Sequence, residues 1–258
     1  MSQSYLTNIT ILCDDRLSFP LFSEHGFSVL IERRGEEALL FDTGGSDVFI
    51  KNAKILGKDL TKVENIVISH GHYDHAGGLK YLAKFDKKYK VYLRREALLP
   101  KYSGDRFTGI DWDSIKKDFD FIFVEKDIEE IEKGIYIFGP SPLRSEFNSI
   151  DPNFCVINEK GEKVKDKFED ELSLVIDEGE GIILITGCAH RGIVNIVDDA
   201  LNKFNKRINL LIGGFHLYKS SEEKVKKVVD SLKGFNIGKI LPYHCTGEIA
   251  IKLLDLHN

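Results

Sequence analysis

Histidines dominate the part of the sequence that can do chemistry. Residues 69–78 place His70, His72, Asp74 and His75 within a single short stretch that directly follows an apolar segment. Imidazole nitrogens and carboxylate oxygens are ligands that suit zinc and similar divalent cations. Side chains alternate in an extended loop, so His70 and His72 can turn the same way, while Asp74 and His75 lie at the next turn. The spacing therefore predicts a metal site here, with room for a second cation.

Three more histidines, His190, His216 and His244, each follow an apolar segment and precede a predicted helix. Layered α/β structures gather such strand ends along one edge, where their sites lie. We therefore expect one metal cluster that includes His190 and His244. Asp42 ends a fourth predicted strand in the same manner, and its carboxylate would orient a ligating imidazole.

Hydrophobic patterning predicts the elements that position these residues. Strands are expected at residues 8–13, 27–32, 38–41, 63–69, 89–93, 121–124, 134–138, 172–176, 181–186, 208–212 and 239–241. Helices are expected at residues 47–56, 79–84, 193–204, 222–232 and 248–256. Strands first, followed by alternating strands and helices, predict a mixed α/β fold with helices outside the sheets.

Composition bounds the kind of protein. The chain has 258 residues, 42% of them hydrophobic, and a formal net charge of −5. We expect one domain over residues 1–258, with irregular excursions at about 94–120 and 139–171. Scattered cysteines and the lack of an apparent export signal favour the cytoplasm. The mild acidity argues against nucleic-acid binding, and no apolar run suits a membrane helix. A homo-oligomer is compatible with the sequence.

The H-x-H-x-D-H motif, the Asp-Thr-Gly at residues 42–44 and the strand-end histidines resemble the metallo-β-lactamase superfamily. The strings at residues 24–26, 186–190, 213–216 and 244–247 resemble its dihydropteroate-synthase-like branch, which includes a methanopterin-pathway synthase. This resemblance implies a four-layer αββα sandwich with a metal pair at the shared edge of its two sheets.

The resemblance also implies ligands. His70 and His72 match the ligands of the first metal, and Asp74, His75 and His244 match those of the second. In most relatives a histidine precedes the strand that ends in Gly-Asp or Gly-Cys, but residues 167–171 contain none. The missing middle ligand has several candidates, namely His190 as an imidazole, Cys188 as a bridging thiolate or a buried neighbour of the site, and Asp170 or Glu171 as an oxygen ligand.

The implied activity is that of an enzyme with two divalent cations, zinc first, with Mn²⁺, Fe²⁺ or Mg²⁺ as alternatives. We predict metal-activated hydrolysis of a small phosphorylated or diphosphate substrate. Asp74 would orient the nucleophile, His216 would stabilise developing charge, and His25 and Arg144 would contact the substrate. One alternative is a transferase that joins a dihydropterin methyl diphosphate to a ribofuranosyl-aminobenzene phosphate. Iron-dependent redox chemistry is less favoured, because His72 stands where diiron members usually carry glutamate.

Overall fold

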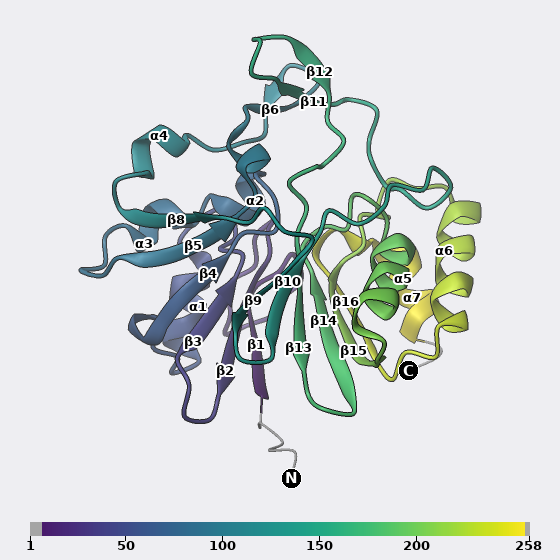
Figure 1. Ribbon diagram of the computed structural model, residues 1–258, viewed down its shortest axis with the longest axis horizontal. Helices are drawn as coiled ribbons and strands as arrows, with labels where there is room; N and C mark the ends of the chain where they lie inside the picture. Colours follow the sequence, from purple (N-terminus) through teal and green to yellow (C-terminus); the bar gives the residue numbers. More distant parts are fainter. Residues whose placement is uncertain (1–6, 256–258) are drawn as a thin grey trace. The chain divides into compact units, whose positions relative to one another are not determined.

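The computed structural model describes residues 7–255 as two compact units (Figure 1). The N-terminal unit comprises residues 7–125 and 151–170, and the C-terminal unit comprises residues 126–150 and 171–255. The prediction of one domain over residues 1–258 stays a prediction, and residue 256 of the last predicted helix lies outside the described residues.

The N-terminal unit contains a six-stranded mixed sheet in the order β1-β2-β3-β4-β5-β8. Its strands are β1 (Thr7–Cys13), β2 (Ser28–Arg33), β3 (Ala38–Phe41), β4 (Val63–Val67), β5 (Tyr89–Leu93) and β8 (Phe119–Phe123). Strands β3, β4, β5 and β8 run parallel, whereas β2 is antiparallel to both β1 and β3. The carboxyl ends of β1, β3, β4 and β5 therefore meet at one sheet edge.

Helices cover one face of this sheet (Figure 1). The helical segments are α1 (Val48–Ile55), α2 (Tyr73–Ala76), α3 (Leu79–Leu82), α4 (Trp112–Ile115) and the 3-10 turns η1 (Leu60–Lys62) and η2 (Arg95–Leu98). Phe49 of α1 and Leu79 of α3 are fully buried with Leu30, Leu40 and Ile66 of the sheet. The same periodicity that predicts these elements thus forms the core that holds the sheet edge in place.

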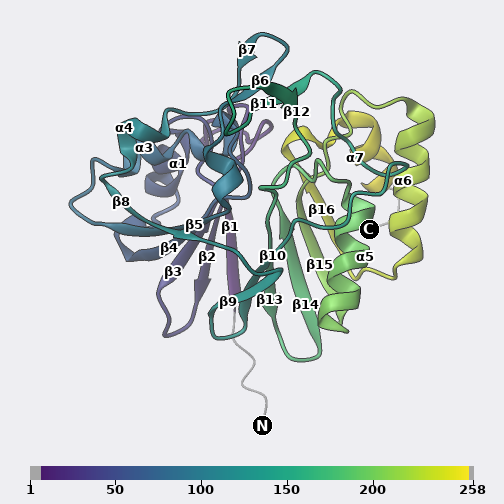
Figure 2. The ribbon, with the colours of Figure 1, turned by 45° about the horizontal axis from the view of Figure 1, so that its top comes forward.

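A second, smaller sheet belongs to the same unit and has the order β12-β11-β6-β7 (Figure 2). Its strands are β6 (Lys101–Ser103), β7 (Arg106–Phe107), β11 (Phe154–Ile157) and β12 (Lys163–Lys165). These strands lie within the two excursions that the sequence predicts to be irregular. Strands of two to four residues are too short for an alternating pattern to be recognised in sequence.

The C-terminal unit contains a six-stranded sheet in the order β16-β15-β14-β13-β10-β9. Its strands are β9 (Ile128–Glu132), β10 (Ile135–Phe138), β13 (Ser173–Asp177), β14 (Gly181–Thr186), β15 (Arg207–Gly214) and β16 (Ile240–Tyr243). Because β14, β15 and β16 run parallel, their carboxyl ends meet at one edge. Strand β9 was not predicted, since three of its five residues are glutamates, a composition compatible with its place at the edge of the sheet.

Helices α5 (Ile193–Phe204), α6 (Glu222–Gly234) and α7 (Glu248–Asp255) lie beside this sheet, and the 3-10 turn η3 (His244–Thr246) precedes α7 (Figure 1). Ile196 of α5 and Val228 of α6 are buried with Leu184 and Leu211 of the strands. Ser221 caps α6 by accepting a hydrogen bond from the Lys224 amide at 3.3 Å. Among the described helices, none combines the length and apolarity that crossing a bilayer would require.

Candidate metal centre

The two histidines of the H-x-H motif leave the end of β4 and face one another. His70 Nε2 lies 3.1 Å from His72 Nδ1, and both side chains are buried. Burial, reinforced by the neighbouring imidazoles of His75 and His72, lowers the pKa of His70 well below its usual value. A pKa lowered in this way favours the neutral imidazole, which is the form that binds a metal.

His75 is fixed by Asp42, which follows the parallel strand β3. Asp42 Oδ2 lies 2.7 Å from His75 Nδ1, and the Ser69 hydroxyl and amide donate hydrogen bonds to the two Asp42 oxygens at 2.7 Å each. The Nε2 atom of His75 is turned toward Asp74, whose Oδ2 lies 3.7 Å away. Carboxylates commonly orient metal-binding histidines in this way. The arrangement suits the orienting role predicted for Asp42.

A second histidine also contacts Asp74. His25 Nε2 lies 3.4 Å from Asp74 Oδ2, and His25 Nδ1 lies 2.8 Å from Asp15 Oδ2. Asp74 is buried, whereas the His25 side chain is about half exposed. Asp15 thus orients a solvent-accessible imidazole toward a carboxylate of the predicted metal motif. Such a group can exchange protons with solvent or with a bound molecule.

Two glycines allow this loop to pack closely against its neighbours. A Cβ on Gly71 would overlap the carbonyl oxygen of Ala97, and a Cβ on Gly78 would overlap that of Thr43. Neither position tolerates a side chain without a backbone shift. These contacts explain why glycines flank the ligand-type residues.

Two carboxylates of this edge, Glu24 and Asp15, were not identified from the sequence. Glu24 accepts hydrogen bonds from the Gly45 and Ser46 amides, both at 3.1 Å, and so holds the loop after Asp42. Asp15 lies two residues after the end of β1, at the same sheet edge as Asp42, which follows β3. The strand-end reasoning that selected Asp42 could therefore have found Asp15 as well.

In the C-terminal unit, His190, His216 and His244 follow β14, β15 and β16 respectively. The His190 and His216 rings are close, with centroids 4.1 Å apart. His216 and His244 have positive φ angles of 46° and 48°, and Ala189 has 56°. Left-handed backbone costs free energy for these residue types and is concentrated at functional sites. The structure therefore brings these strand-end residues together on strained backbone.

Two cysteines of the C-terminal unit lie beside these histidines. Cys188 Sγ lies 3.4 Å from Cys245 Sγ, and ligand atoms of Cys188, His216 and Cys245 all lie within 4.8 Å of one another. Burial tends to raise the pKa of Cys245, but hydrogen bonds to Cys188 and His216 and the charge of His244 lower it overall. Thiolate sulfur and imidazole nitrogen are both good zinc ligands. Cys245 has no site role among the sequence-based predictions.

The carboxylates considered for the middle ligand have other partners. Glu171 accepts hydrogen bonds from the His190 amide at 2.6 Å and the Arg191 amide at 2.9 Å. Asp170 binds Lys101 and the Gly71 amide. Both oxygens of each carboxylate are thus engaged, which favours His190 or Cys188 as the middle ligand.

Arg144, predicted to contact substrate, is exposed and forms an ion pair with Asp198. Its substrate contact stays a prediction. The same is true of the expectation that His70, His72, His190 and His244 share one metal cluster. Both units carry donor types that suit a divalent cation. These are imidazole and carboxylate in the N-terminal unit and, in the C-terminal unit, the imidazole of His216 with the thiols of Cys188 and Cys245.

Comparison with known proteins extends these observations. The family model described as the metallo-β-lactamase superfamily matches residues 23–151. The chain is 36% identical to the uncharacterized protein MJ0448 of Methanocaldococcus jannaschii, with 97% of this chain and 95% of that protein covered. It is 29% identical to the 7,8-dihydropterin-6-methyl-4-(β-D-ribofuranosyl)-aminobenzene-5′-phosphate synthase of the same organism, with 88% of this chain and 83% of the synthase covered.

A solved structure supports the same family assignment. Tm1679, described as a metal-dependent hydrolase of the β-lactamase superfamily, superposes with a TM-score of 0.87 at 46% identity, covering 96% of this chain and 91% of Tm1679. These comparisons confirm the predicted fold class and the resemblance to the synthase-like branch. The chain belongs to the metallo-β-lactamase superfamily.

Proposed function

We propose that this protein is a metal-dependent enzyme that hydrolyses a small phosphorylated or diphosphate substrate. The observation that carries the proposal is the pair of buried imidazole nitrogens of His70 and His72, 3.1 Å apart, on the same loop as the Asp42-bound His75. Buried imidazoles facing one another are suited to share a cation. The 46% identity with Tm1679, which is described as a metal-dependent hydrolase, supports the same conclusion.

The predicted ligands divide into two pairs in the N-terminal unit. His70 and His72 would hold one divalent cation, and Asp74 and His75 would hold a second. His190 and His244 are proposed to supply further ligands. We propose zinc, because imidazole with carboxylate or thiolate suits it best among common divalent cations. When bound, the cations supply Lewis acidity toward a phosphoryl oxygen and lower the pKa of water toward neutrality.

The protein's own side chains then carry the remaining steps. Asp42 keeps the His75 proton on Nδ1, so that Nε2 faces the metal position. Asp74 accepts a hydrogen bond from the attacking water and orients it toward phosphorus. His25, oriented by Asp15, is placed to carry a proton at Nε2 between Asp74 and the substrate or solvent. His216 donates a hydrogen bond to the charge that develops on the phosphoryl oxygen.

Transferase activity is the second candidate. The specific observation in its favour is the 29% identity with the dihydropterin methyl ribofuranosyl-aminobenzene phosphate synthase over 88% of this chain. In this reaction the diphosphate would leave the dihydropterin methyl carbon as the acceptor attacks it. The same side chains would orient the diphosphate. The two reactions differ in the nucleophile and in the atom attacked, which is phosphorus in the hydrolysis and the methyl carbon in the transfer.

The acceptor provides the test. Zinc-loaded protein is incubated with a panel of phosphoesters and with dihydropterin methyl diphosphate, each with and without ribofuranosyl-aminobenzene phosphate. Hydrolysis predicts phosphate or diphosphate release without the acceptor, whereas the transferase predicts a coupled product only when the acceptor is present. Absence of turnover on every substrate by protein that binds zinc would overturn both candidates. Bound iron with visible absorbance and redox activity would instead support the redox alternative.

We also propose that the partners are small molecules rather than nucleic acid or membrane, and that the protein acts in the cytoplasm. The formal net charge of −5 supports the exclusion of nucleic acid, since binding to phosphate backbones relies on a surplus of lysine and arginine. Electrophoretic mobility shift with duplex DNA and with RNA at low salt tests the first point. A stable shift would contradict it.

A further inference from the structure

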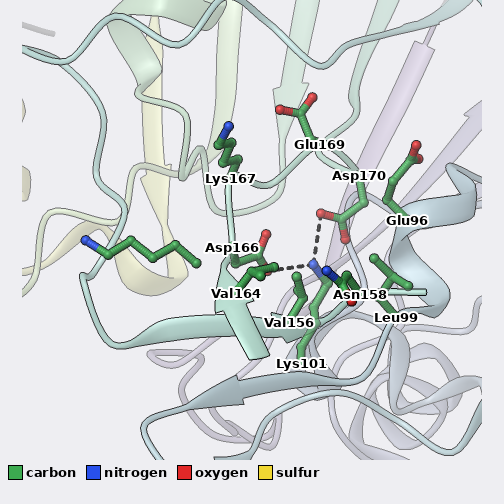
Figure 3. A pocket seen from close by; sticks show the side chains of 11 residues that line it. Glu96, Leu99, Lys101, Val156, Asn158, Val164, Asp166, Lys167, Glu169 and Asp170 are labelled. Atoms are coloured by element: carbon green, nitrogen blue, oxygen red, sulfur yellow. Dashed lines mark hydrogen bonds and ion pairs between the residues drawn. The ribbon is translucent and has the colours of Figure 1, made fainter. Parts of the chain in front are cut away.

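A buried lysine lies in the N-terminal unit beside the loop that carries His70 and His72. Lys101, the first residue of β6, is 1% exposed, and its Nζ lies 2.8 Å from Asp166 Oδ2 and 3.0 Å from Asp170 Oδ1 (Figure 3). Burial tends to lower the pKa of Lys101, but the charges of Asp170 and Asp166 outweigh it and raise the pKa overall. Fully buried lysines are rare and costly unless they are paired in this way. We call Lys101, Asp166 and Asp170 the Lys101 cluster.

The Lys101 cluster is connected directly to the metal motif. Asp170 Oδ2, the oxygen of that carboxylate not bound to Lys101, accepts a hydrogen bond from the Gly71 amide at 2.8 Å. Gly71 stands between His70 and His72, and it is 99 positions away from Asp170 in the sequence. A long-range contact therefore fixes the peptide that joins the two facing imidazoles.

The same segment also packs on the imidazole rings themselves. The Phe168 ring centroid lies 5.9 Å from that of His70 and 5.4 Å from that of His72. Lys101 Nζ lies 5.2 Å from the Phe168 ring centroid. Phe168 is fully buried and has a positive φ of 52°. Residues 166–170 thus turn alternate side chains inward, two of them to Lys101 and one to the histidines.

Gly71 is confined from another direction by η2. A side chain at Gly71 would overlap the Ala97 carbonyl oxygen, so the loop lies directly against that turn. The loop is therefore held by a hydrogen bond to Asp170, by contact with Ala97 and by the Phe168 ring. None of these groups needs to contact a cation in order to decide where the imidazole nitrogens lie.

We propose that the Lys101 cluster is a positioning unit that sets the separation of His70 Nε2 and His72 Nδ1 before metal binds. The proposal rests on the proposed metal-dependent function, because it assigns these residues to the geometry of that site. Lys101 neutralises Asp170 in a buried environment, Asp170 holds the Gly71 amide, and Gly71 fixes both histidines. Removing the hydrogen-bond acceptor at residue 170 would loosen the loop and weaken metal binding without removing a ligand.

The test compares Asp170→Ala with a control that loses core packing nearby. Val156 lines the same cavity of about 400 Å³ as the Lys101 cluster, and Val156→Ala removes buried apolar atoms without changing the Gly71 contact. Lys163→Met removes an exposed lysine of the same small sheet. The measurements are zinc affinity by competition with a chromophoric chelator, the visible spectrum of the Co²⁺-loaded protein, and thermal stability without metal.

We expect Asp170→Ala to weaken zinc binding by roughly 10- to 100-fold, the range found when groups supporting metal ligands are removed, and to change the Co²⁺ spectrum. Asp166→Asn leaves the Gly71 contact in place but loosens Lys101, so a smaller loss in the same direction is expected. Val156→Ala should lose thermal stability yet keep the wild-type affinity and spectrum, and Lys163→Met should change none of the three. Asp166→Asn alone decides the question if Asp170→Ala does not fold.

The proposal would be overturned if Asp170→Ala kept the wild-type zinc affinity and Co²⁺ spectrum. If only Asp166→Asn folds, the same result in that variant would overturn it. Either result would leave the proposed function intact. An equal loss of affinity in Val156→Ala would also overturn it, because general destabilisation would then be the cause. Wild-type protein that binds no divalent cation would overturn the proposed function, and this proposal with it.

Discussion

Asp42 is the residue on which the orientation of His75 depends. Its carboxylate accepts from the Ser69 amide and hydroxyl and lies 2.7 Å from His75 Nδ1. Its own φ of 57° places it in the left-handed region, which is uncommon for aspartate. The backbone strain at this position is compatible with a residue retained for its contacts rather than for local stability.

Replacing Asp42 with asparagine should change the tautomer of His75. The amide NH₂ can face Nδ1, which then becomes an acceptor and moves the ring proton to Nε2, the nitrogen expected to bind metal. We expect the zinc affinity of one site to fall by roughly 10- to 100-fold, measured by competition with a chromophoric chelator. Asp59→Asn, at an exposed helix cap of the same unit, is the control. Equal affinities in Asp42→Asn and wild type would remove Asp42 from the site.

Asp74 is the residue expected to link metal binding to chemistry. Asp74→Asn keeps the size of the side chain and one oxygen, but it removes the charge that balances a second cation. We expect the second metal to bind more weakly, the first to remain with His70 and His72, and turnover to fall by roughly a hundredfold or more. Metal content and turnover are measured together, with Asp47→Asn, near α1, as the control. Unchanged turnover on a confirmed substrate would exclude Asp74 from the mechanism.

Among the elements, β5 carries a tyrosine whose ionisation affects stability. Burial, aided by the charge of Asp59, raises the pKa of Tyr89 to about 12. An unfolded tyrosine ionises near pH ~10. Below about pH 10, Tyr89 is neutral in the folded and unfolded states, and its contribution to the free energy of unfolding is complete. That contribution is lost as the pH rises from about 10 to 12.

Tyr89→Phe should remove this loss of stability at alkaline pH. The variant forfeits the 3.4 Å hydrogen bond from the Tyr89 hydroxyl to the Leu60 carbonyl, so it should be less stable by about 1 kcal/mol at neutral pH. Above about pH 10, the difference between variant and wild type should shrink or change sign. Urea unfolding midpoints of both proteins across this range provide the measurement. A constant difference at every pH would contradict the burial of an un-ionised Tyr89.

The sequence predicted those elements whose patterning is local. The strand that became β14 and the helix that became α5 match their predicted bounds, because their apolar residues follow a single period over six or more residues. Strand β9 was missed because glutamates interrupt the apolar pattern, and β6 and β7 because two or three residues carry no period. The ion pair between Lys101 and Asp170 spans 69 positions and leaves no local sequence signal.

The candidate site was predictable to the extent that strand order could be inferred. Asp42 and His70 follow the neighbouring parallel strands β3 and β4, so strand-end reasoning places them at one edge. Asp15 obeys the same rule and was overlooked. Cys245, which contacts Cys188, directly follows His244, whose φ is positive, and backbone of that kind is not predictable from residue type.

At the scale of the whole molecule, metal binding should contribute to stability. Any cation that binds only the folded protein stabilises it, by about 2.7 kcal/mol when its free concentration is 100 times the dissociation constant. Chelation should therefore lower the thermal unfolding midpoint, and added zinc should restore it. A midpoint that does not respond to chelation of a metal-loaded sample would contradict a metal site that forms only in the folded protein.

The number of donor atoms that the N-terminal unit supplies is too small for two zinc sites. His70, His72, Asp74 and His75 offer two donors to each of two cations, whereas protein zinc sites take three or four protein ligands. The C-terminal unit carries further imidazoles and thiols, among them His190 and His244. We therefore expect wild-type protein to bind two zinc ions per chain, and His190→Ala and His244→Ala each to weaken one of them by at least tenfold, about 1.4 kcal/mol. Cys155→Ala, at a partly exposed thiol of β11, should bind both normally. Full, wild-type binding by both histidine variants would show that the N-terminal unit and solvent complete the metal centre.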